Sequence, residues 1–148
     1  MEYLTTHDLV WVNNLVTGEV LTYNYVNLEA AMAGQYRYGQ SRNVPEQGAV
    51  LLNRLLFKAP FARGNRRTAF VALMTFLNAN GYAASVDDAE AAQTLYAVES
   101  GQLSPIDAIE KLAAPAEGAL PAELTLRTLI THEFNLHTEA LRALAPGD

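Results

Sequence analysis

Apolar residues recur every three or four positions along most of this chain, a spacing that is typical of helices with one buried face. The first helix is predicted to begin at Thr5 or Thr6, whose hydroxyl can cap it, and to end at Gly18. Residues 19–26 alternate loosely between apolar and polar, which favours an extended segment. A short helix capped by Asn27 is expected to follow.

A polar stretch, residues 35–44, precedes the next helix and indicates an exposed loop. Pro45 suits the first position of that helix, because proline lacks a backbone N–H. Pro60 must end it, since proline disfavours the α conformation in the residue before it, and residues 59–64 then form a loop. The helix is expected to bury a wide apolar stripe of Val50, Leu51, Leu52, Leu55 and Leu56.

The following helix is predicted to be the centre of the fold. Asn65 is a good N-cap, and the helix runs from there to about Asn78, before Asn80 and Gly81 end it. Its apolar residues face nearly every direction: Ala69, Phe70, Val71, Ala72, Leu73, Met74, Phe76 and Leu77. A helix of that kind must be covered on all sides, so we expect a central buried helix at 65–79.

Three further helices are expected in the second half of the chain. One begins at Asp87 and ends at Gly101, and another follows a serine cap with proline at its first position and covers roughly residues 105–114. Residues 114–118 form a small hinge, and a last helix covers residues 121–144. The pattern therefore predicts an all-α fold in one compact domain with six or seven helices.

The composition supports this fold class. The 148 residues include 24 alanines and 21 leucines but only 13 valines and isoleucines, a balance that favours helix over strand. Cysteine is absent, which excludes disulfides, thiolate metal sites and a cysteine nucleophile. No apolar run reaches the length of about 18 residues that a membrane span needs, and the first residues do not resemble a signal peptide. We therefore expect a cytoplasmic protein with no membrane partner.

The net charge of −6 is unevenly distributed. Residues 1–67 hold seven basic and five acidic side chains, whereas residues 68–148 hold three basic and eleven acidic ones. Five of the ten basic side chains fall within residues 54–67. A basic cluster in an acidic protein argues against direct nucleic-acid binding and indicates a small anionic ligand or an internal acidic face.

The junction between the loop at 59–64 and the central helix carries the strongest chemical signal. Gly64 permits a backbone shape that side chains would block, and free N–H groups at the helix start can bind an anion such as phosphate. Arg66 and Arg67 lie in the first turn, where cations oppose the helix dipole. A bound phosphate would offset that cost. The alternative is that both arginines are solvated, or pair with carboxylates of the acidic half.

The segment Ala59-Pro60-Phe61-Ala62-Arg63-Gly64-Asn65-Arg66-Arg67-Thr68 resembles the signature of the Fic/Doc (Fido) family, H-x-F-x-D/N-G/A-N-G/K-R. It is most similar to the Doc (death-on-curing) branch. Residues 47–52 and 76–82 are similar to the helix before the motif and the ending after it. The resemblance covers about residues 2–114 and implies a compact Fic/Doc-like helical bundle. Residues 115–148 are then expected to be a helical extension packed on that domain.

The resemblance also assigns roles to individual residues. Gly64 and Asn65 match the loop that holds the phosphates of a nucleotide, which would be ATP or another nucleotide. Arg67 matches the arginine that contacts phosphate, and Arg66 stands where Doc-type members have lysine. Phe61 matches the aromatic residue that anchors the loop in the core.

Two positions depart from the family pattern. The family's histidine, which is the general base, is Ala59 here, and general-base catalysis commonly contributes about 10²–10⁴-fold in rate. The family's acidic residue, which helps to hold magnesium, is Arg63, and arginine cannot ligate a hard cation. The sequence therefore replaces both the general base and the metal-holding acid that the family uses, while it keeps the phosphate-binding loop. Binding of magnesium is left as an open alternative.

Three functions remain open on this basis. The first is a Doc-like protein with degraded phosphoryl or nucleotidyl transfer and a retained phosphate-binding loop. The second is an active transferase, either a protein kinase or an AMP-transferring enzyme, in which Arg63 replaces the metal charge and His7, His132 or His137 serves as a displaced base. Each histidine is equally consistent with an ordinary helix-surface residue.

The third function is that of a toxin–antitoxin component that binds a protein target or an antitoxin-like protein, or a second copy of the chain. The acidic helix 121–144 could lie across the basic loop and inhibit the protein in cis. We do not expect this, because Thr128 and Glu133 are one residue too far apart for the inhibitory motif S/T-x-x-x-E-G/N of some Fic proteins.

Overall fold

The computed structural model describes residues 1–37, 42–116 and 125–148. These residues form eight α-helices, one 3-10 helix and a two-stranded sheet, so the predicted all-α class is confirmed, with one helix more than expected. In chain order the elements are α1 (Thr6–Thr17), α2 (Tyr25–Met32), η1 (Ala33–Gln35), α3 (Val44–Lys58), α4 (Asn65–Ala79), β1 (Tyr82–Ala84), α5 (Asp88–Glu99), α6 (Pro105–Leu112), β2 (Ala113–Pro115), α7 (Leu126–Leu136) and α8 (Thr138–Leu144).

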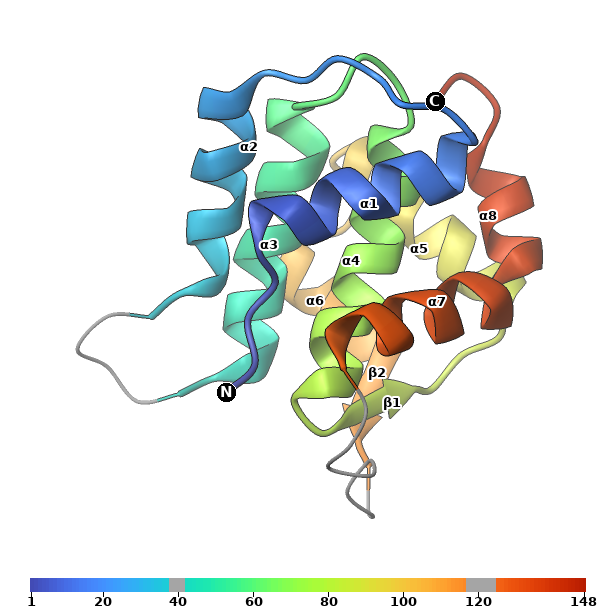
Figure 1. Cartoon of the computed structure of the whole chain (residues 1–148). Helices are drawn as coiled ribbons and strands as arrows, with labels where there is room; N and C mark the ends of the chain where they lie inside the picture. The colour runs from blue at the N-terminus through green and yellow to red at the C-terminus, as the bar shows by residue number, and fades with distance from the viewer. Residues whose placement is uncertain (38–41, 117–124) are drawn as a thin grey trace.

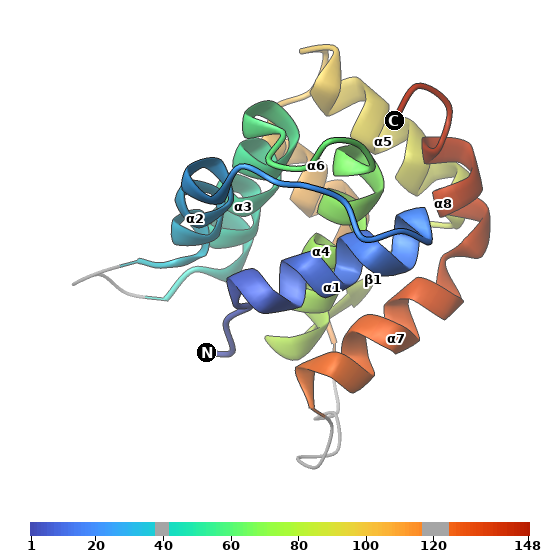
Figure 2. The same cartoon turned by 45° about the horizontal axis from the view of Figure 1, so that its top comes forward.

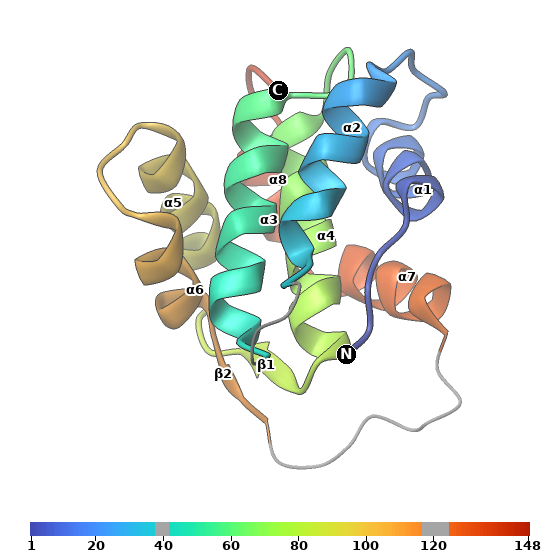
Figure 3. The same ribbon diagram turned by 90° about the vertical axis from the view of Figure 1, so that its left-hand side faces the viewer.

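Helix α4 lies at the centre, as predicted for a helix that is apolar on nearly all sides (Figures 1 and 3). Every residue from Thr68 to Leu77 is buried. Helices α1, α3 and α7 pack directly on α4, while α2 and α6 pack on α3, and α5 packs on α6 and α8. The core is therefore organised as a shell of helices around one buried helix.

Several helix starts and stops follow the sequence signals. Thr5 caps α1 in a reciprocal capping box with Asp8, and Gly18 ends that helix in the left-handed conformation. The side chain of Asp87 caps α5 and that of Ser104 caps α6. These boundaries are local, because each cap bonds a backbone group only three residues away.

The region before α2 differs from the prediction. Asn24, not Asn27, is the N-cap, because its side chain accepts the hydrogen bond from the backbone N–H of Asn27. Helix α2 therefore starts at Tyr25, inside the segment expected to be extended. The rest of that segment contributes an isolated antiparallel bridge between Tyr23 and Phe61.

Helix α3 starts one residue earlier than expected, with Asn43 as its cap and Pro45 in its second position. It ends at Lys58, and its C-cap residue Ala59 is in the left-handed conformation (φ 41°) before Pro60, which cannot continue the helix. Its buried stripe is narrower than predicted, since Val50 is 40% exposed.

The loop predicted at 35–44 is not uniformly exposed. Gln35 is fully buried, and its side-chain amide bonds both the N–H and the C=O of Leu4, at 2.8 and 2.7 Å. Residues 38–41 lie outside the described part of the chain.

The predicted hinge at 114–118 begins as a strand instead. Residues 113–115 pair antiparallel with residues 82–84, with Ala84 opposite Ala113 and Tyr82 opposite Pro115. The pairing shortens α6 and joins two segments about thirty residues apart, which no local pattern could indicate. Residues 117 and 118 lie outside the described part of the chain.

The single helix predicted at 121–144 is two helices, α7 and α8, separated at His137 (φ −108°, ψ 36°). Helix α7 packs on α4 and α1, while α8 packs on α5. The break allows the two helices to follow different surfaces of the core. Residues 121–124 lie outside the described part of the chain.

Within the described residues, none of the helices combines the length and apolar character needed to cross a bilayer.

The glycine inside α3 offers a test of this packing. Gly48→Ala is expected to stabilise the protein by about 1 kcal/mol, because glycine is a poor helix former and the added Cβ would lie 3.4 Å from methyl groups of Leu73 and Leu77. Urea unfolding measures the change. Gly34→Ala is the contrast, since its Cβ would lie 3.0 Å from Cγ1 of Val50 and should destabilise the protein. Stabilisation by both substitutions would contradict this packing.

Candidate functional site

The loop at 59–64 is held by backbone hydrogen bonds to the connector between α1 and α2. The N–H of Asn24 donates to the carbonyl of Pro60 at 2.7 Å, and the N–H of Ala62 donates to the carbonyl of Thr22 at 3.1 Å. This loop, the connector and the segment 145–148 gather at the N-terminal end of α4 (Figures 1 and 2). The predicted site residues therefore lie where three distant parts of the chain meet.

Asn65 does not cap the helix, so that prediction was wrong. Gly64, with φ 78°, occupies the N-cap position, and Asn65 is the first helical residue. The side-chain amide of Asn65 reaches back and bonds both the N–H and the C=O of Phe61, each at 2.9 Å. Phe61 is 5% exposed and belongs to the core, as expected for a loop anchor. Asn65 therefore fixes the shape of the loop.

Asn13 is a site residue that the sequence reasoning missed. It lies on α1 and is buried, and its side-chain N–H group donates to the carbonyl of Arg63 at 2.9 Å and to the hydroxyl of Thr68 at 3.2 Å. Its Oδ1 atom has no hydrogen-bond partner among the described residues. A polar residue on the face that α1 buries, between Leu9 and Val16, was the available signal.

Gly64 is required for packing as well as for backbone conformation. A Cβ at this position would lie 2.5 Å from Cγ2 of Thr17 and 3.1 Å from Nδ2 of Asn13. The junction between the 59–64 loop and α4 therefore packs so closely against α1 that a side chain at position 64 would not fit.

The N-terminus of α4 holds an anion that belongs to the chain itself, the side-chain carboxylate of Asp148. Its Oδ1 accepts from the backbone N–H of Arg66 at 2.8 Å, and its Oδ2 accepts from the backbone N–H of Arg67 at 3.1 Å. The guanidinium of Arg67 adds a third bond, from Nε to Oδ2 at 2.9 Å. The Asp148 side chain is only 5% exposed. Two backbone donors and one guanidinium thus enclose a buried oxyanion.

Arg66 is engaged on both edges of its guanidinium. Nε and Nη2 donate to the two carboxylate oxygens of Glu99, both at 2.9 Å, and Nη1 donates to the carbonyls of Leu144 and Pro146 at 2.8 and 3.0 Å. The hydrogen bond to Glu99 raises the pKa of Arg66 against the opposing effect of burial. Of the alternatives that the sequence left open, the structure shows pairing of both arginines with carboxylates of the acidic half.

The two positions that depart from the family pattern lie at the surface. Ala59 is exposed, and Arg63 forms an ion pair with Glu19. Among the described residues, the side chains that hydrogen bond to the 59–64 loop include no histidine. A magnesium ion does not fit the Arg63 position, because a guanidinium repels a cation and here neutralises the nearest carboxylate.

The three histidines do not supply a free base to this loop. His7 and His132 are exposed on α1 and α7. His137 is buried, with Nδ1 2.8 Å from Oδ1 of Asp88 and Nε2 2.9 Å from Oε2 of Glu133. Burial lowers the pKa of His137, but the hydrogen bonds to Glu133 and Asp88 outweigh it and raise the pKa above the usual 6.5. His137 is therefore held between two carboxylates at the junction of α7 and α8.

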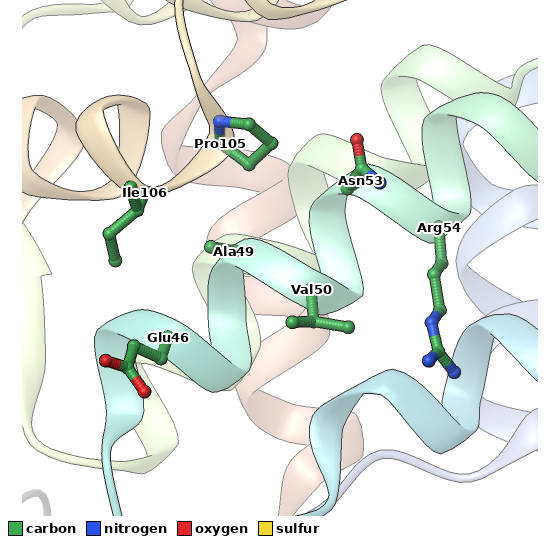
Figure 4. A pocket seen from close by; sticks show the side chains of 7 residues that line it. All are labelled: Glu46, Ala49, Val50, Asn53, Arg54, Pro105 and Ile106. Carbon is green, nitrogen blue, oxygen red and sulfur yellow. The ribbon is translucent and has the colours of Figure 1, made fainter.

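A separate groove of about 660 Å³ lies between α3 and α6 (Figure 4). Its lining comes from Glu46, Ala49, Val50, Asn53, Arg54, Pro105 and Ile106, and the guanidinium of Arg54 points away towards α2, where it donates to the carbonyl of Ala30 at 2.8 Å. None of the predicted site residues lines this groove.

A scan against protein-family models, a search of curated proteins and a search of solved structures each found no match to this chain. Any assignment of function therefore rests on the residues and on their geometry.

Gly64→Ala is expected to destabilise the protein by about 2–4 kcal/mol, through the left-handed conformation and the clash with Thr17. Chemical denaturation measures the loss. Thr17→Ser removes the clashing methyl, so the double variant should recover part of the stability while the backbone strain remains. If Thr17→Ser recovers nothing, the close approach to α1 is not the cause.

The buried histidine predicts a pH dependence of stability. Because the pKa of His137 is raised in the folded state, its contribution is fully present below about pH 6.5 and is lost as the pH rises through the folded-state pKa. The urea midpoint should therefore fall as the pH rises above about 6.5. His137→Gln should remove this decline, whereas His132→Gln on the exposed face of α7 should keep it. An unchanged decline in His137→Gln would contradict the assignment.

Proposed function

We propose that this chain is a Doc-like member of the Fic/Doc family that binds the phosphates of a nucleotide at the start of α4 and has lost group transfer. The phosphate-binding residues are Gly64, Asn65, Arg66 and Arg67. ATP or another nucleotide is the proposed ligand, and a protein partner is the proposed target of its action.

One observation supports this proposal most strongly, namely the oxyanion already held at the start of α4. A carboxylate and a phosphate present the same kind of acceptor, and helix N-termini with adjacent arginine bind both. The donors that hold Asp148 are the backbone N–H groups of Arg66 and Arg67 and the Arg67 guanidinium. These are the residues that the family resemblance assigns to phosphate.

The loss of group transfer is supported by Ala59 and Arg63, which replace the side chains that this chemistry needs. General-base catalysis requires an acceptor within hydrogen-bond reach of the attacking hydroxyl, and alanine at position 59 offers none. A displaced base is not supported by His137, because both of its ring nitrogens are engaged by carboxylates. Arg63 is likewise engaged, by Glu19. The protein is therefore proposed to act by binding, with an antitoxin-like or target protein as partner.

The proposal predicts phosphate binding without transfer. Purified protein with Mg²⁺ and a cell lysate should give no protein labelling from ATP labelled at either the α or the γ phosphate, or from UTP labelled at the α phosphate. Inorganic pyrophosphate should still shift the amide resonances of Arg66 and Arg67 in ¹H–¹⁵N spectra. Arg67→Gln should weaken that binding by about tenfold or more, as expected for loss of one charged hydrogen bond.

Arg142→Gln is the matched control, because Arg142 is an exposed arginine on α8 that pairs with neighbouring Glu139. It should leave pyrophosphate binding unchanged. Labelling that disappears in Arg67→Gln would show an active transferase and contradict the loss of transfer. The absence of any amide shift at saturating pyrophosphate, in the wild type and in variants of Asp148, would contradict the phosphate site.

A further inference from the structure

We propose that the outer face of α3 is the contact surface of a symmetric dimer, in which α3 packs antiparallel against α3 of a second copy of the chain. This surface consists of Glu46, Val50, Asn53 and Phe57 together with the groove between α3 and α6. None of residues 64–67 lines that groove, so the inference does not depend on the proposed phosphate site.

Large apolar side chains are exposed in one part of the chain rather than scattered along it. Among the described residues, eight of them are exposed, and seven of these lie between residues 20 and 57. Two are on α3, namely Val50, which is 40% exposed, and Phe57, which is 57% exposed. Because they are seven residues apart, they lie on the same face of the helix, about 10 Å from each other along its axis. Neighbouring exposed apolar side chains of this kind are typical of an interaction surface.

This face carries both a projecting side chain and a hollow that can receive one. The projecting side chain is Phe57, near the end of α3. The hollow is the groove of about 660 Å³, where Ala49 and Val50 of α3 lie opposite Pro105 and Ile106 of α6 (Figure 4). A surface that contains both parts of a contact can be complementary to its own copy, as a two-fold interface requires.

An antiparallel arrangement brings the projecting side chain and the hollow together. When the two-fold axis passes beside Asn53, position 57 of one copy lies opposite position 50 of the other. Phe57 of each copy then enters the groove beside Val50 of the other copy. Asn53, which is exposed, lies at the axis, where the two amides can hydrogen bond to each other. A polar residue at such a position fixes the register of two packed helices.

The charges at the two ends of α3 favour the antiparallel arrangement. Glu46 lies in the first turn, with a side chain that is 53% exposed, and Lys58 is exposed at the last position. In the antiparallel pair, Lys58 of one copy lies within about one helical turn of Glu46 of the other. The two helix dipoles also oppose each other, which is the favourable orientation. A parallel pair would instead place like charges side by side.

The oligomeric state of the full chain tests the proposed surface. Sedimentation equilibrium up to about 1 mM protein detects even a weak dimer, and the wild type should form one. Phe57→Glu should raise the dissociation constant about tenfold or more, because it removes the aromatic contact and places a charge in the groove beside Glu46. Leu136→Glu is the matched control, since Leu136 is also 57% exposed but lies on α7, and it should leave the dissociation constant unchanged. Circular dichroism checks that each variant keeps its helices.

Cysteine cross-linking tests the position of the two-fold axis. The chain contains no cysteine, so Asn53→Cys introduces a single thiol into each copy. Two thiols beside the axis lie close enough for a disulfide, and oxidation with diamide should join the two chains of a dimer. Glu139→Cys, at an exposed position on α8, should not cross-link under the same conditions. Adding Phe57→Glu to Asn53→Cys should abolish the cross-link.

The possible results decide the inference without affecting the proposed function. A dimer that needs Phe57 and cross-links through position 53 supports it. A protein that is monomeric at about 1 mM overturns it and leaves this face to a different partner. A dimer that is unaffected by Phe57→Glu, or that does not cross-link through position 53, also overturns it, because the copies then meet on another face or in another orientation. An intact dimer that binds no pyrophosphate contradicts only the proposed phosphate site.

Discussion

The fold depends on burying α4 on every side. Because water cannot reach the ends of a buried helix, the unpaired backbone N–H and C=O groups there need partners within the protein. Each end is therefore closed by residues from far away in the sequence. At the N-terminal end Asp148 accepts from the first turn, and at the C-terminal end the Asn80 side chain bonds the N–H and C=O of Glu2 at 2.8 and 2.9 Å. Near that end Asn78 donates to Glu133 at 2.7 Å. Residues 2 and 148 are thus hydrogen-bonded to opposite ends of α4, around which the other helices pack.

The same constraint explains what the sequence could and could not predict. The position of α4 follows from its apolar residues, and the caps at Thr5 and Asp87 follow from bonds that span three residues, so both were predictable. The pairing of β1 with β2 and the break at His137 depend on contacts between distant segments, so no local sequence pattern predicts these two features. Asn24 and Asn27 illustrate the limit, since both residues are good caps, and the structure uses Asn24, whose backbone N–H also donates to the carbonyl of Pro60 at 2.7 Å.

At the candidate site, two arginines in the first turn of a helix oppose the helix dipole, and the structure shows that carboxylates of the same chain compensate for this. The sequence could not reveal which carboxylates these are, because Asp148 and Glu99 lie 81 and 33 residues from their partners. Asn65 and Asn13 show the same limit for uncharged groups. Both are amides near the loop, yet one closes the loop on Phe61 and the other connects it to α1, and only their position in three dimensions distinguishes these roles.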